Sequence, residues 1–294
     1  METTSSNLFA PAVETPMQRL MADLRGLLWV AKKEFLYFVR YPSWVIGLFV
    51  WPVIFPMGYI LSARALSGPD GSGLLLFTQR TGVEDYLGYI AIGTTVWMWQ
   101  NAVLWNVGYA LRGEQFRGTL ETNWMSPSWR FSFLLGPSLT FMVMMLIFLV
   151  ISAVEFGVLF GVQMHGNPLL VLLVLLAATP SIYGLGMAFA SLIITAKEAN
   201  NFVFLVRGLV MIFCGITFPV DLLPDWMEGV AKVLPQTHIL RAMRTSILTN
   251  ASFQDLLPDL LILAGFGAFW LAAGYLIFNR MERRARQTGA IGQY

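Results

Sequence analysis

The chain has 294 residues, of which 56% are hydrophobic and 12% charged, and its mean hydropathy is +0.64. Soluble globular domains carry roughly twice that charged share, so the composition argues against a soluble domain and favours a chain with lipid as its solvent. The formal net charge of +2 gives no reason to expect a nucleic-acid partner.

The N-terminal region precedes the first apolar run. No short apolar core followed by a small-residue cleavage site occurs in it, so we expect no cleavable leader. Residues 1–15 are polar and aperiodic and are predicted to be disordered. Apolar residues then recur at helical spacing: Leu20, Leu24, Leu27, Leu28, Ala31 and Phe35. This pattern predicts an amphipathic helix in the cytoplasmic membrane interface; the alternative is a short soluble helix.

Six stretches reach the roughly 20 apolar residues that a bilayer-spanning helix needs. They cover residues 43–63, 86–111, 131–160, 168–195, 199–218 and 260–279. The third contains Glu155, which we place near the outer surface, and the fifth contains Arg207. Pro52 and Pro56 predict a kink in the first stretch. We therefore predict an all-α integral membrane domain of six transmembrane helices over residues 16–286, with a cytosolic tail over 287–294.

The distribution of Lys and Arg predicts the orientation. With both termini inside, the inner segments hold 13 of these residues and the outer segments 5, with Arg207 within a span. Cytoplasmic loops carry the excess of basic residues, so both termini are predicted to be cytosolic, as for a multi-pass protein of the plasma membrane.

The outer segment between the fifth and sixth stretches, residues 215–248, is neither apolar enough to cross a membrane nor polar enough for a plain loop. Two short amphipathic helices that dip into the outer leaflet account for this character. Broken backbone at membrane depth is tolerated where protein buries it or a cavity hydrates it. We therefore expect re-entrant outer helices here.

Motifs of nucleotide and metal chemistry are absent from the sequence. It contains no Gly-x4-Gly-Lys-Ser/Thr run, no Gly-x-Ser-x-Gly elbow and no His-Glu-x-x-His pair. Only two histidines, His165 and His238, and one cysteine, Cys214, are available as soft metal ligands. We expect a chain that is not an enzyme and has no catalytic residue, metal site or cofactor of its own.

The inner segment 112–127 reads RGEQFRGTLETNWMSP. It resembles the coupling-helix region of the type 2 permeases of ABC transporters, although Phe116 and Asn123 depart from the common pattern. The matching positions are Glu114, Arg117, Gly118, Thr119, Leu120, Glu121, Ser126 and Pro127. Gly118 is suited to end one helical turn and Thr119 to cap the next. The alternative is a solvated loop with capping residues.

The outer segment resembles the re-entrant region of the same permeases. Its matching positions are Phe218, Pro219, Leu223, Pro224, Trp226, Pro235, Thr237 and either Arg241 or Arg244. Leu234 replaces the usual asparagine. The two resemblances together cover the chain from about Pro16 to Arg286.

The resemblance implies a homodimer, or a pair with a related chain, over two cytosolic ATPase subunits that hold ATP and Mg. It further implies ATPase contacts at 112–127 and, secondarily, at Lys197 and Glu198. A substrate path between the protomers would be lined by the first, second and fifth spans. Importer permeases carry a Glu-Ala-Ala-x3-Gly loop, and its absence favours export.

The candidates for this path are Trp51, Phe55, Trp97, Gln100, Asn101 and Arg207. The aromatic residues form either a path wall or ordinary core packing, and the amides either contact substrate or hydrogen-bond between helices. Arg207 either faces an acidic or phosphate-bearing substrate or extends to the inner headgroups.

The predicted function is the membrane subunit of an ATP-driven exporter of an amphipathic drug, lipid or lipid-linked substrate. A polysaccharide or glycolipid exporter is the alternative within this class. Outside it, an ion-coupled secondary transporter is disfavoured because paired intramembrane carboxylates and an inverted repeat are absent from the sequence.

Overall fold

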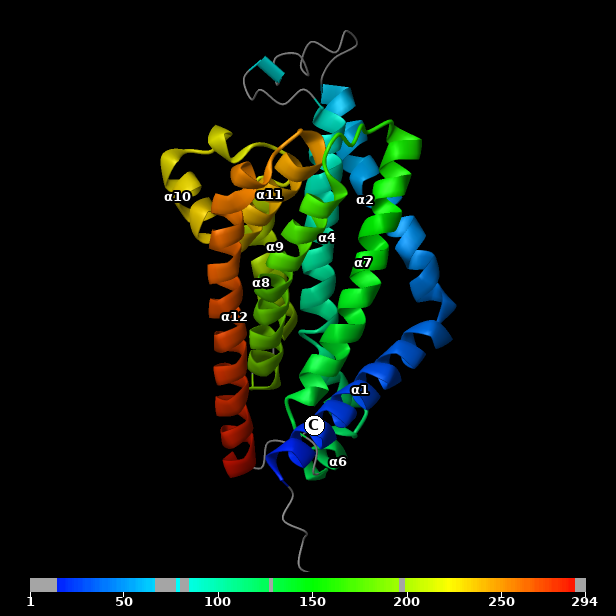
Figure 1. Ribbon diagram of the computed structural model, residues 1–294, viewed down its shortest axis with the longest axis vertical. Helices are drawn as coiled ribbons and strands as arrows, with labels where there is room; N and C mark the ends of the chain where they lie inside the picture. The colour runs from blue at the N-terminus through cyan, green and yellow to red at the C-terminus, as the bar shows by residue number, and fades with distance from the viewer. Residues whose placement is uncertain (1–14, 67–77, 80–84, 127–128, 196–198, 289–294) are drawn as a thin grey trace, which may run out of the picture.

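The structure, a computed structural model, describes residues 15–66, 78–79, 85–126, 129–195 and 199–288. Within them the regular elements are all helical and form a bundle of long helices with shorter helices at both ends (Figure 1). Four helices contain stretches long and apolar enough to cross a membrane: α2 (Pro42–Leu66), α7 (Ser132–Phe160), α8 (Pro168–Thr195) and α12 (Phe253–Thr288). This architecture agrees with the predicted helical integral membrane protein.

Two further helices cover predicted spans but fall outside these four. The second predicted span contains α4 (Tyr86–Asn106), whose amides, threonines and tryptophans lower its hydropathy. The fifth contains α9 (Ala199–Phe213), which is apolar but shorter than the other spans. The expected helix over 86–111 is also wrong in detail, because α4 ends at Asn106 and a separate helix, α5 (Ala110–Phe116), follows.

The core of the bundle lies around α4, which contacts α2, α7, α8, α9 and α11 (Pro235–Leu248). Most of its side chains are buried, including the large Trp97 and Trp99. A helix that is enclosed by protein tolerates polar side chains that a lipid-exposed helix does not. The burial of α4 therefore accounts for its mixed composition.

The helix pair with the most extensive contact is α8 with α12. A Cβ added to Gly184 would lie 2.6 Å from the backbone nitrogen of Leu271, so only glycine permits this approach. Ser181 donates a hydrogen bond across the same interface to the carbonyl of Leu263 at 3.2 Å. Small residues and hydroxyl groups are common at helix interfaces in membranes, where no hydrophobic effect drives association.

The first helix, α1 (Pro16–Arg40), lies obliquely across one end of the bundle (Figure 1). Thr15 caps it in a capping box with Gln18, and the remaining residues predicted to be disordered lie outside the described residues. Its inner face packs on α7, where Thr140 donates to the carbonyl of Ala31 at 2.8 Å. Leu24 and Leu28, from the predicted apolar face, are exposed, as a helix in the membrane interface requires.

At the other end, two short helices follow α9: α10 (Asp225–Val233) and α11, preceded by the 3-10 turn η1 (Val220–Leu222). The predicted pair of short helices is present, with Pro219 before η1, Pro224 before α10 and Pro235 opening α11. Prolines suit these positions because the first turn of a helix needs no backbone donor.

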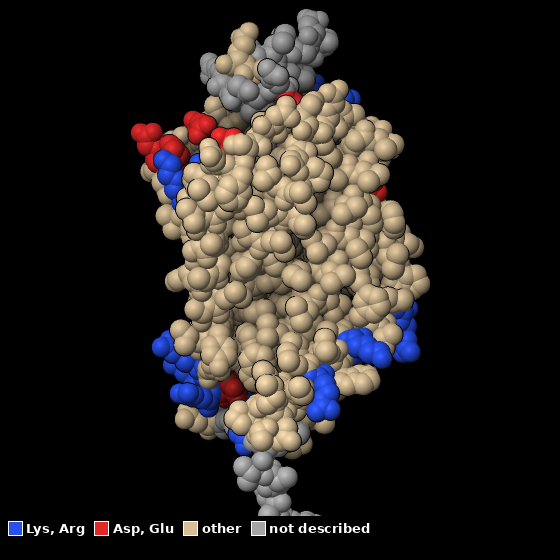
Figure 2. Space-filling view, viewed as in Figure 1, with Lys and Arg blue, Asp and Glu red and all other residues tan. Residues whose placement is uncertain are grey.

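The surface agrees with a membrane setting. Figure 2 shows a broad band almost free of charged side chains between two charged ends. Lys and Arg gather at the end where α1 and the last turns of α12 lie, whereas Asp and Glu are seen near α10 at the other end. Basic residues therefore predominate at one end of the bundle, whereas the other end carries both acidic and basic residues.

Candidate functional site

The inner segment forms a tight turn between α5 and α6 (Leu120–Met125). Gly118 has a φ of 70°, in the left-handed region that favours glycine. The Gly118 N–H donates to the carbonyl of Gln115 and the Thr119 N–H to that of Glu114, both at 3.0 Å. This is the Schellman pattern that closes a helix with a glycine. The glycine thus turns the chain so that α6 folds back beside α5.

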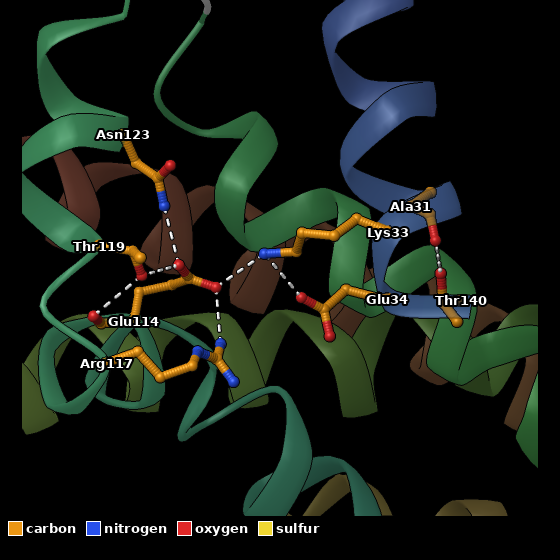
Figure 3. Close-up of polar contacts among 8 residues, drawn as sticks. All are labelled: Ala31, Lys33, Glu34, Glu114, Arg117, Thr119, Asn123 and Thr140. Carbon is orange, nitrogen blue, oxygen red and sulfur yellow. Dashed lines mark hydrogen bonds and ion pairs between the residues drawn. The ribbon is translucent and has the colours of Figure 1, made fainter. Parts of the chain in front are cut away.

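Glu114 is the centre of this turn, with 5% of its surface exposed. Its carboxylate accepts hydrogen bonds from Lys33 at 2.7 Å, Arg117 at 2.6 Å, Thr119 at 2.5 Å and Asn123 at 2.8 Å (Figure 3). We call these five residues the Glu114 junction. Buried charges are stable only when they are paired and hydrogen-bonded, and this one has donors from α1, from α6 and from the turn between α5 and α6.

The electrostatics of the junction hold Glu114 ionised. Burial alone raises the pKa of this carboxyl, but hydrogen bonds from Lys33 and Thr119 and the charges of Lys33 and Arg117 outweigh it. The result is a pKa lowered to about 2. At neutral pH the group is a carboxylate that fixes α1 to the α5–α6 turn.

Thr119 corrects one expectation. It is the first residue before α6, but its hydroxyl does not accept a backbone N–H there. It donates to the Glu114 carboxylate instead, because a buried carboxylate needs donors more than the helix end does. Asn123, which departs from the common pattern of the permeases that this segment resembles, supplies another of these donors.

The turn is also fixed to α12. Arg130 donates to the carbonyl of Trp124 at 3.3 Å and pairs with Glu282 at 3.0 Å. Trp124 is buried, with its ring 6.2 Å from that of Phe278 on α12. The segment is therefore a rigid body joined to α1 and α12 rather than a solvated loop.

The segment also presents a face to its surroundings. Glu121 is exposed and makes no polar contact with another described residue, and Phe116 and Met125 are 71% and 80% exposed. These two apolar side chains lie at the basic end of the molecule, beyond the uncharged band. Exposed apolar side chains together with an exposed carboxylate on one short segment are typical of a protein contact surface.

The path candidates lie near the middle of the bundle. Phe55 of α2 stacks on Trp97 of α4 at 4.9 Å, and the Arg207 guanidinium lies 5.3 Å from the same Trp97 ring. The side-chain oxygen of Gln100 and nitrogen of Asn101 are buried without a hydrogen-bond partner. Among the described residues, these two amides therefore make no hydrogen bond to a neighbouring helix, which was the alternative to substrate contact.

Comparison with known proteins identifies the family. Residues 49–276, from α2 to the middle of α12, match the family described as ABC-2 family transporter protein. The chain belongs to the ABC-2 family. It is also 28% identical over 134 residues to the linearmycin resistance permease protein LnrN of Bacillus subtilis (strain 168). That match covers 43% of this chain and 34% of the relative, so the similarity to LnrN is partial.

In this ABC-2 family member the structure separates the sequence-predicted site residues into groups. It brings together Glu114, Arg117 and Thr119, leaves Glu121 exposed, and turns Leu120 into the core. Ser126 donates within the segment to the carbonyl of Asn123. Pro127, Lys197 and Glu198 lie outside the described residues. Among the path candidates, Trp51 is 56% exposed on α2.

The sequence did not reveal several contributors. Lys33 is 81 positions from Glu114, and Arg130 is 152 positions from Glu282. In the outer segment, Trp226 is 67% exposed with its ring against Phe213, whereas Arg244 points inward to backbone carbonyls. The polarity of segment 112–130 and its resemblance to a coupling-helix region indicated the junction, but neither identified the partner on α1.

Proposed function

We propose that the chain is the transmembrane subunit of an ATP-driven exporter whose ATPase is a separate polypeptide. The observation that supports this best is the Glu114 junction, which makes the α5–α6 segment a rigid projection joined to α1. A partner that presses on such a projection moves the helices attached to it. The sequence has no P-loop, so the driving hydrolysis belongs to a partner with bound ATP and Mg.

The proposed assembly contains two copies of this chain and two ATPase subunits. Support for a homodimer comes from an apolar face on α2 and α9, exposed in the single chain. Its members are Trp51, Ile54, Met57, Phe204, Leu205 and Ile212. Apolar exposure of this kind is typical of interfaces with protein or lipid. The path would run along this face between the protomers, lined by α2, α4 and α9.

The proposed topology has six spans, with α4 and α9 added to the four helices above, and both termini in the cytosol. The helices α10 and α11 would be re-entrant in the outer leaflet. Support comes from the basic end of the molecule, which by the positive-inside rule faces the cytoplasm of a plasma membrane. The substrate we propose is an amphipathic compound; the relative's name links that protein to resistance against one compound, linearmycin.

Co-purification tests the proposed function. The tagged chain is extracted from its native membrane in a mild detergent, and the proteins retained with it are identified and assayed for ATP hydrolysis. We expect a P-loop ATPase in equal stoichiometry. If the folded chain retains no ATPase, the ion-coupled transporter becomes the better explanation.

A charge reversal at Glu121 tests the contact surface. Because Glu121 is exposed, Glu121→Lys is expected to leave the fold intact but to weaken ATPase association about fivefold, as changes of interface charge do. Transport-linked ATP hydrolysis should fall in parallel. The matched control is Asp225→Lys, an exposed reversal at the opposite end. Unchanged coupling in Glu121→Lys would show that this face does not receive the ATPase.

Cysteine labelling tests the topology. Cys214, the single native cysteine, is buried, so an introduced cysteine gives the main signal. A membrane-impermeant maleimide applied to whole cells is expected to label Asp225→Cys and to label Glu121→Cys only after permeabilisation. The reverse pattern would mean that the orientation is inverted.

A further inference from the structure

A series of aromatic rings, interrupted once, follows the side of the bundle formed by α2, α4, the turn after α4, and α9. Adjacent ring centroids lie 5.2 Å apart for Tyr109–Trp105, 5.9 Å for Trp105–Phe204, 4.9 Å for Trp97–Phe55 and 5.6 Å for Phe55–Tyr59. We call these six residues the aromatic strip. It extends from the basic end of the bundle past its middle, and all its members except Trp97 are at least partly exposed.

Phe204 and Trp97 are the two neighbours in the strip whose rings do not touch, and the Arg207 side chain lies between them. Its guanidinium lies 5.6 Å from the ring centroid of Phe204 and 5.3 Å from that of Trp97. Cation–π contacts of this kind hold a guanidinium in a defined place. They do not neutralise its charge, and Arg207 has no hydrogen-bond or ion-pair partner among the described residues, with its Nε buried.

The position of Arg207 argues against a role at the membrane surface. Trp97 is nine residues from the inner end of α4, which places the guanidinium about 14 Å along the helix from that end. Sequence analysis left open an extension to the inner headgroups, but the side chain lies beside mid-helix Trp97 instead. An unpaired cation at that depth is costly unless an anion joins it, and intramembrane charges commonly mark transport paths.

The helices of the proposed interface offer no acidic side chain as this anion. The three helices that carry every member of the strip except Tyr109, namely α2, α4 and α9, contain no Asp or Glu. A symmetric dimer formed through this face would instead bring a second Arg207 to the same region. The strip thus combines a flat apolar surface with an unsatisfied positive charge, and the indole nitrogen of Trp97 is a further buried donor without a partner.

We propose that the strip with Arg207 binds an amphipathic anion, a compound with an aromatic or other flat apolar body and one carboxylate, sulfonate or phosphate group. This inference rests on the proposed export function, because it names the class of compound that the path accepts. The apolar body stacks on the rings and the acidic group accepts charge-assisted hydrogen bonds from Arg207. The occupant is a transported compound rather than a bulk membrane lipid.

A pair of fluorescent probes tests the proposal on the purified chain in phosphatidylcholine nanodiscs. The probes are 1-anilinonaphthalene-8-sulfonate and its uncharged analogue N-phenyl-1-naphthylamine, which share an aromatic body but differ in the sulfonate. Arg207→Gln is expected to weaken binding of the anionic probe at least about tenfold and to leave the neutral probe unchanged. Arg207→Lys should retain most of the affinity, and the exposed Arg283→Gln all of it.

The other outcomes decide against the proposal. Equal affinity of wild type and Arg207→Gln for the anionic probe overturns it, as does an equal loss for both probes, which indicates damaged structure rather than lost charge recognition. Addition of phosphatidylglycerol to the nanodiscs separates the two sources of anion. If this lipid abolishes the dependence on Arg207, a bulk headgroup satisfies the arginine and the substrate assignment is wrong.

This assay uses no ATPase, so the exporter function and the class of substrate are tested independently of each other. Absence of an ATPase partner in the co-purification overturns the exporter function whatever the probes show. A retained ATPase together with probe binding independent of Arg207 overturns only the class of substrate.

Discussion

Replacing Glu114 with glutamine is expected to lower the thermal stability of the purified chain and to uncouple transport from ATP hydrolysis. The variant keeps the shape of the side chain but removes the charge on which Lys33 and Arg117 converge. The pKa of the wild-type carboxyl falls from its ordinary 4.5 to about 2, which for an enclosed group corresponds to about 3 kcal/mol. Lys33 and Arg117 are half-exposed and screened by water, so we expect about 1–2 kcal/mol.

The functional loss should exceed the loss of stability. If the proposed function holds, the junction carries motion from the ATPase to α1, so a loosened junction affects every cycle. Transport by the assembled complex should fall about tenfold or more, which corresponds to about 1.4 kcal/mol of lost coupling. Asp225→Asn is the matched control, since it removes an exposed carboxylate at the opposite end of the bundle, away from the ATPase contact surface. Normal coupled transport by Glu114→Gln would show that the junction only stabilises the fold.

The pH dependence of stability gives a second readout. A carboxyl whose pKa is lowered by folding contributes its full stability above the unfolded pKa and loses it as pH falls toward the folded pKa. The difference in melting temperature between wild type and Glu114→Gln should therefore be complete above about pH 5 and shrink between pH 4.5 and 2. A double-mutant cycle with Lys33→Gln measures how much of it belongs to that ion pair. A difference that does not change with pH would rule out a buried carboxylate as its origin.

The success of the sequence predictions followed the strength of the local signals. The predicted stretch 168–195 coincides with α8, and 131–160 differs by one residue from α7, because Gly, Pro and polar residues bound these apolar runs clearly. The end of α4 was missed, because composition does not reveal the turn at 107–109. There the Asn106 side chain bonds back to the carbonyl of Ala102.

Long-range contacts limited the prediction of the site. The polar segment 112–130 marked the region, and Gly118 marked its turn, since both are local features. The role of Glu114 was not predictable, because the sequence alone does not distinguish a buried glutamate from an exposed one. Its partner Lys33 belongs to a helix that looks like a membrane-interface helix, and only the packing of α1 on α7 brings the two charges together.

Replacing Arg244 with methionine is expected to be the most destabilising change among the outer helices. The Arg244 guanidinium donates to the carbonyls of Tyr89 at 3.2 Å, Gly215 at 2.8 Å and Ile216 at 2.7 Å, all three on buried residues. It also lies 3.3 Å from the Tyr89 ring centroid. This one side chain thus joins α11 to α4 and to the turn after α9. Methionine has a similar length but no donor, so at least two carbonyls lose a partner, at a cost of about 2–4 kcal/mol.

The measurement is the temperature at which half of the detergent-solubilised chain remains monodisperse. Arg241→Lys is the control on the same helix, since Arg241 is exposed and lysine keeps a positive charge beside its buried partner Asp259. We expect its loss to be under half of that for Arg244→Met. Gly93→Ala disrupts the packing of α4 on the turn after α9, because its new Cβ would lie 2.0 Å from the Ile216 carbonyl oxygen. If Arg244→Met and Gly93→Ala both melt like wild type, the outer helices are not held to α4 at this point. Motion of the path helices would then not be transmitted to them through Arg244.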